Sequence, residues 1–125
     1  MCNLVPMQLC GQTVNVAEHK VEKIRKYLEV FPKLKSVDKV YLFGSTLETR
    51  CNENSDIDLL FVYNNRELFH HEMSWDMLDM FPESAEDDAL RIPEGYDIKR
   101  AMGAMRVAIS KGKLIYERSN TKNTN

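Results

Sequence analysis

The sequence predicts a single α+β domain in which helices pack against a mixed β-sheet. Its 125 residues suit one domain, 43% apolar and 29% charged residues are ordinary for a globular protein, and both strand-like and helix-like periodicities occur. A chain of this length buries a hydrophobic core without disulfides. Residues 1–118 are expected to form the domain, and the polar residues 119–125 a disordered tail.

Charge and cysteine content limit the classes of function. A net charge of -2 and a pI near 5.9 argue against a general nucleic-acid-binding surface, so direct nucleic-acid binding is not expected. The three cysteines are widely spaced and form no CxxC pair, which favours reduced thiols over a zinc site. No signal peptide or membrane-spanning run is recognisable, so we expect a cytoplasmic protein without membrane contact.

The N-terminal part predicts one helix. Residues 1–14 have no clear periodicity, and a short edge strand or a packed tail both remain open. Asn15 is a plausible N-cap for a helix over residues 16–31, in which apolar residues recur every three or four positions. Pro32 ends this helix.

Two strands follow, separated by a polar connection. Residues 37–43 alternate loosely and are rich in β-forming residues, which predicts a strand that ends at Gly44-Ser45. A short helix can form over residues 45–50. Residues 56–63 predict a second strand, and its run Leu59-Leu60-Phe61-Val62 is typical of a central strand covered on both faces.

The C-terminal half predicts helices with short strands between them. Residues 66–80 have helical periodicity. Residues 82–93 are acidic and turn-rich, which favours an exposed connection, with a short strand around residues 90–92 left open. Residues 96–98 predict a third strand. The chain then closes with a helix over residues 101–111 and a strand over residues 114–116.

Asp56 and Asp58 are candidate metal ligands. Residues two apart in a strand point to the same face, so these two carboxylates lie side by side while Ile57 and Leu59 point into the core. Ionised carboxylates this close repel each other, and the pattern therefore indicates a cation between them. Hard divalent ions such as Mg²⁺ prefer such oxygen ligands.

The two strands carry a family resemblance. Gly44-Ser45 after an apolar strand, followed ten residues later by Asp56-Ile57-Asp58, resembles the signature of the DNA polymerase beta-like nucleotidyltransferase superfamily. The short chain and its ending, Gly112 to Glu117, are similar to the minimal nucleotidyltransferase (MNT) branch, whose small proteins often pair with a HEPN-domain partner. The resemblance implies the nucleotidyltransferase fold.

The resemblance also implies an activity and a site. A nucleoside monophosphate would pass from an NTP, with ATP expected, to a hydroxyl of a protein or other acceptor, and pyrophosphate would leave. Gly44 and Ser45 would bind the phosphates of the NTP. Two Mg²⁺ ions would be held by Asp56, Asp58 and a third acid on a later strand, for which Asp97 is the candidate and also the candidate base.

One departure from the family pattern supports an alternative function. Small members commonly have an Arg-rich stretch with a glycine directly after Gly-Ser, whereas this chain has Thr46 to Thr49 with Glu48 among them. The alternative is a catalytically weak, antitoxin-like protein of a toxin–antitoxin pair, whose cleft a HEPN-type partner or a second copy completes. A third alternative, a drug-modifying nucleotidyltransferase, usually needs a second domain that 125 residues do not provide.

Overall fold

A computed structural model describes residues 3–48 and 56–118. Its centre is a four-stranded sheet in the order β5-β4-β3-β6. β3 runs antiparallel to both of its neighbours, whereas β5 is parallel to β4, so the sheet is mixed. The strands are β3 (Val37–Phe43), β4 (Asp58–Tyr63), β5 (Asp88–Pro93) and β6 (Lys113–Glu117). The predicted α+β class is confirmed.

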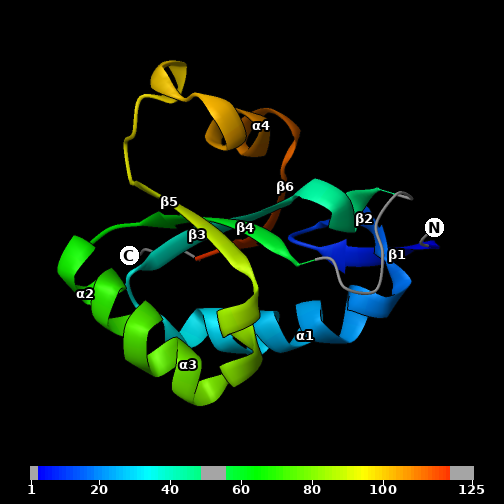
Figure 1. Ribbon diagram of the computed structural model, residues 1–125, viewed down its shortest axis with the longest axis horizontal. Coiled ribbons are helices and arrows are strands. Elements are labelled where there is room, and N and C mark those ends of the chain that lie inside the picture. Colours follow the sequence, from blue (N-terminus) through cyan, green and yellow to red (C-terminus); the bar gives the residue numbers. More distant parts are fainter. Residues whose placement is uncertain (1–2, 49–55, 119–125) are drawn as a thin grey trace.

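Helices cover both faces of the sheet. Figure 1 shows α1, α2 and α3 on one face and α4 on the other. Their bounds are α1 (Val21–Val30), α2 (Arg66–His71), α3 (Met77–Met80) and α4 (Gly103–Lys111). No helix within residues 3–48 and 56–118 combines the length and the apolar character that crossing a bilayer requires.

The two faces of the sheet bury different side chains because residues alternate along each strand. Leu42, Leu59 and Phe61 belong to the large core on the α1 side. Leu60 and Ile92 belong to a smaller cluster that packs against Ala108 of α4. The prediction that β4 is a central strand covered on both faces is therefore confirmed.

The N-terminal segment contains the strand that the sequence left open, but the helix begins later than predicted. β1 (Leu4–Leu9) and β2 (Gln12–Ala17) pair antiparallel as a hairpin, and the helix predicted over residues 16–31 begins only at Val21. In β2 the buried Val14 and Val16 alternate with exposed residues, which is the period of a strand. The hairpin turns at Cys10 and Gly11, which both have positive φ.

The predicted helix over residues 66–80 is confirmed as a nearly continuous helical segment. The side chain of Asn65 caps its start by accepting a hydrogen bond from the Leu68 N–H. A π-helical turn, Glu72–Asp76, joins α2 to α3. This segment contributes Phe69 and Met77 to the larger core, which α1 and the N-terminal hairpin also line.

The strand predicted over residues 96–98 is wrong. The third strand that pairs with the sheet is β5, at the place the sequence left open. Past its end the chain turns at Gly95, which has a φ of +81°, and then forms a 3₁₀ turn over Ile98–Arg100. The predicted tail over residues 119–125 lies outside the described residues.

Candidate active site

Gly44 ends β3 directly beside Asp58. In the antiparallel β3–β4 ladder the last pair is Phe43 with Asp58. The end of β3 therefore lies beside the start of β4. Gly44 has a φ of +81°, which favours glycine, and a Cβ placed there would overlap with Oδ2 of Asp58. The Gly44 backbone therefore packs against the Asp58 carboxylate, and a larger residue would displace one of the two.

Ser45 follows in a 3₁₀ turn, Gly44–Leu47, at the same end of the sheet. Its side chain is half-buried, and its carbonyl accepts a hydrogen bond of 2.9 Å from the Glu48 N–H. Thr46 is fully buried, and its Oγ1 has no hydrogen-bond partner among the described residues. The turn thus keeps Ser45 accessible while Thr46 points into the protein. Arg50, the first basic residue after Gly-Ser, lies outside the described residues.

Asp58 projects from the face of the sheet that carries α4. Leu60, two residues further along β4, belongs to the cluster on that face, whereas Leu59 belongs to the opposite core. Asp56 precedes β4 and is exposed, and its charge contributes to raising the pKa of Asp58. The predicted proximity of the two acids is therefore consistent with the structure.

The structure brings Asp88, rather than Asp97, to Asp58. Asp58 and Asp88 are the first pair of the parallel β4–β5 ladder. Leu90 and Ile92, which alternate with Ala89 and Arg91 on β5, belong to the same cluster as Leu60, so Asp88 projects from the α4 face as well. The two carboxylates are close enough for Asp88 to be among the causes that, after burial, raise the pKa of Asp58.

This arrangement changes the acidity of Asp58. Burial raises the pKa of Asp58 to about 6, with further contributions from the charge of Asp88, the charge of Asp56, the hydrogen bond with Asp88 and the charge of Asp87. The site therefore gathers more negative charge than the protein itself neutralises. Such an excess is typical of carboxylates that bind a cation.

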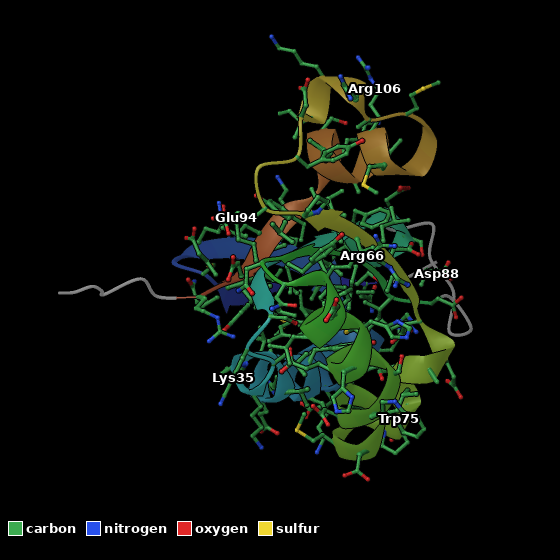
Figure 2. All side chains as sticks on the ribbon, turned by 90° about the vertical axis from the view of Figure 1, so that its left-hand side faces the viewer. Lys35, Arg66, Trp75, Asp88, Glu94 and Arg106 are labelled. Atoms are coloured by element: carbon green, nitrogen blue, oxygen red, sulfur yellow. The ribbon has the colours of Figure 1, made fainter. Side chains whose placement is uncertain are left out.

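Asp97 lies away from this pair. In Figure 2, Asp88 and Glu94 stand at opposite ends of β5, and Asp97 comes three residues after Glu94. The Glu94 N–H donates to the carbonyl of Tyr63, the last residue of β4, which lies roughly 17 Å along the strand from Asp58. Asp97 is exposed, and its carboxylate accepts from the Lys99 N–H at 3.0 Å as a cap.

The alternation of residues after Asp88 indicates a strand, although the local composition indicates a loop. Asp88 lies in an acidic run that resembles a solvated loop. After Asp88, however, Leu90 and Ile92 alternate with less apolar residues, as in a strand. Asp88 is the first residue of β5, just as Asp58 is the first residue of β4. The pattern of an acid followed by alternating apolar residues applies to Asp88 better than to Asp97.

The acids fit a hard divalent cation. Within residues 3–48 and 56–118, no three His, Cys, Asp or Glu side chains are gathered as tightly as the ligands of one metal ion. Asp58 and Asp88 are nevertheless in contact, with Asp56 close by, and all three offer carboxylate oxygens. Mg²⁺ prefers oxygen donors, and a cation would relieve the repulsion between these carboxylates, which adds to burial in raising the pKa of Asp58.

A family model described as polymerase beta, nucleotidyltransferase matches residues 22–121. This match includes every strand of the four-stranded sheet and all of the candidate site residues. The chain therefore belongs to the polymerase beta nucleotidyltransferase family.

Two solved structures are similar to the chain. One is a crystal structure from Sulfolobus solfataricus of a protein assigned as a nucleotidyltransferase, with 27% identity, a TM-score of 0.47, and coverage of 81% of this chain and 86% of that one. The other is a mutant of the toxin–antitoxin complex MntA-HpeT, with 14% identity, a TM-score of 0.42, and coverage of 79% and 73%. No curated protein matches the chain.

Proposed function

We propose that this protein is a metal-dependent nucleotidyltransferase that transfers a nucleoside monophosphate from an NTP to an acceptor hydroxyl. The observation that carries the proposal is the contact of Asp58 with Asp88 beside the Gly44 backbone. Membership of the nucleotidyltransferase family supports the reaction class. ATP is the proposed donor, and the cytoplasm is the proposed location.

Each side chain has a role in this proposal. The backbone N–H groups after Gly44 and the hydroxyl of Ser45 bind the phosphates, because glycine allows the closest approach to the chain. Asp56, Asp58 and Asp88 would hold Mg²⁺, with two ions proposed, and the metal would supply positive charge against the triphosphate and the departing pyrophosphate. Asp97 is replaced by Asp88 as the third acid, since Asp88 is the one paired with Asp58.

Asp88 is also the proposed general base. It is exposed on β5, the edge strand of the sheet, where an acceptor can approach from solvent. As the acceptor oxygen bonds to the α-phosphorus, its proton passes to the Asp88 carboxylate, and the bond from that phosphorus to the pyrophosphate oxygen breaks. The proposed acceptor is a hydroxyl on a protein, such as a tyrosine of a HEPN-type partner.

The test uses labelled ATP, GTP, CTP and UTP with Mg²⁺ and the protein encoded by the adjacent gene. We expect label transfer by the parent protein and none by a variant with both Asp56→Asn and Asp58→Asn. Transfer that survives the double substitution would contradict the mechanism.

A second candidate function is binding a partner with little catalysis, as in an antitoxin. Large apolar side chains are exposed around α4: Ile98 at 57%, Met102 at 81% and Val107 at 46%. Such a surface is typical of a contact with another protein or a second copy. A stable complex with the neighbouring protein, without label transfer, would favour this function.

A further inference from the structure

Asp87 is a buried carboxylate whose two oxygens both have partners. Its side chain is 3% exposed. Oδ1 accepts a hydrogen bond of 2.9 Å from the Ile57 N–H. Oδ2 accepts one of 2.7 Å from the Tyr27 hydroxyl and lies 2.9 Å from Nζ of Lys23. Burial, followed by this hydrogen bond and the Asp87 charge, raises the pKa of Tyr27 above its ordinary range, so the tyrosine remains a donor.

These partners join the two strands that carry the acid pair. Ile57 lies between Asp56 and Asp58 in the chain, and Asp87 directly precedes Asp88. Lys23 and Tyr27 are four residues apart and therefore lie on one side of α1. A single side chain thus connects the start of β4, the start of β5 and the helix beneath them.

The position of this contact matters because Asp58 and Asp88 are the first pair of the parallel ladder. The parallel ladder continues only after these two residues, with the pair Leu59 and Ala89. Strand pairing therefore holds the two chain segments together on that side of the acids alone. The hydrogen bond from Ile57 to Asp87 supplies a constraint one residue before that pair, across the same two chain segments. Without it, the acids would be free to separate under their mutual repulsion.

We propose that Asp87 is a positioning residue that fixes the separation of the Asp58 and Asp88 carboxylates and thereby sets the affinity of the site for its divalent cation. The inference rests on the proposed function, in which these acids bind the metal. Partners that orient metal ligands without touching the metal commonly change its affinity by about 10- to 100-fold when they are substituted.

Glu72 provides a matched control for a purely structural role. It is also buried, at 4% exposed, and its carboxylate accepts bonds of 2.8 Å from the N–H groups of both Lys35 and Ser36. In Figure 2, Lys35 and Asp88 lie on opposite sides of the molecule. Glu72 therefore resembles Asp87 in burial and bonding but does not adjoin the acid pair.

The experiment measures Mn²⁺ binding by isothermal titration, below the melting temperature of each variant. Asp87→Asn is expected to weaken Mn²⁺ binding by about tenfold or more. Glu72→Gln is expected to lower the melting temperature while leaving the dissociation constant unchanged. An unchanged dissociation constant in Asp87→Asn, or an equal loss in Glu72→Gln, would overturn the inference.

A rescue distinguishes geometry from general destabilisation. In Asp87→Asn the new NH₂ group faces the Lys23 ammonium, and two donors cannot bond to each other. Adding Lys23→Met removes this conflict, so the asparagine can accept from Ile57 through its oxygen and donate to the Tyr27 oxygen. The double variant is expected to bind Mn²⁺ within about threefold of the parent, and failure to regain affinity would contradict the proposed geometry.

Two further variants, Tyr27→Phe and Asp58→Asn, separate a loss of folding from a loss of metal binding. If Asp87→Asn does not fold, Tyr27→Phe removes one hydrogen bond to Oδ2 and is expected to weaken Mn²⁺ binding about threefold, and no change would overturn the inference. A parent protein that binds no Mn²⁺, or binds it equally after Asp58→Asn, would overturn the proposed function and this inference together. A parent that binds through Asp58 but is insensitive to Asp87 would overturn the inference alone.

Discussion

Asp87 and Asp88 are neighbours in the chain with opposite environments. Asp87 is buried on the α1 side, and protein groups satisfy both of its oxygens. Asp88 is exposed on the other side of the sheet, and its neighbour across the ladder is another carboxylate. One strand thus carries two adjacent acids with different surroundings: hydrogen-bond donors hold Asp87, whereas Asp88 has no such donors in the pairing with Asp58 and is the acid proposed to bind the metal.

The largest expected effect comes from Asp88→Asn. We expect nucleotidyl transfer to fall about a thousandfold or more, because a proposed metal ligand and the proposed base are lost together. The melting temperature should stay the same or rise, since the substitution removes repulsion with Asp58. Steady-state transfer rates and thermal unfolding measure the two effects.

Asp97→Asn is the matched control for this prediction. Asp97 is exposed and caps a 3₁₀ turn beyond the far end of β5, so transfer should remain within about twofold of the parent. A loss with Asp97→Asn equal to that with Asp88→Asn would contradict the assignment of the third acid.

The local half of the site could be predicted from the sequence, and the non-local half could not. β3, β4 and the closeness of Asp56 to Asp58 at the start of β4 follow from strand periodicity and turn chemistry within one stretch of chain. The acid that meets Asp58 is decided by the register of a parallel pair across thirty residues, and several acids precede and follow β5. Composition near Asp97 carried no information about that register.

The N-terminal hairpin could not be predicted from the sequence for a different reason. Its turn places Cys10 at a φ of 51°, a left-handed conformation that sequence rarely indicates for cysteine. The valines of β2 also continue into the apolar period of α1, so the two elements resemble one longer helix. Tertiary burial of Val14 and Val16 decides in favour of the strand.

The next largest effect is on stability and concerns Asp87. Asp87→Asn should lower the free energy of unfolding by about 3 kcal/mol, because it breaks a buried ion pair and leaves Lys23 uncompensated. Urea unfolding of Asp87→Asn and Asp88→Asn measures the contrast. An equal change in the two variants would remove the distinction between the structural and the functional acid.

Gly44→Ala tests the close packing of backbone and acid. We expect transfer to fall about a hundredfold, which is about 2.7 kcal/mol, because a Cβ would displace the Asp58 carboxylate. Gly95→Ala is the control, since Gly95 has the same φ of +81° but has nothing within 4 Å of the added Cβ. Both variants should lose about 1 kcal/mol of stability to backbone strain, and only Gly44→Ala should lose activity. Equal activity in the two variants would show that the overlap has no consequence.

The smallest expected effect is stabilisation by the metal itself. A cation that binds the folded protein alone stabilises it by about 1.4 kcal/mol at ten times its dissociation constant. Thermal unfolding in Mg²⁺ should therefore show a modest rise in melting temperature for the parent protein and for Asp97→Asn, and none for Asp58→Asn. The rise should be larger than the effect of matched ionic strength from NaCl, because relief of the repulsion around Asp58 needs a cation held between the carboxylates rather than screening. Stabilisation that persists in Asp58→Asn would place the bound cation elsewhere on the protein. Asp88 would then have no metal ion to bind beside Asp58.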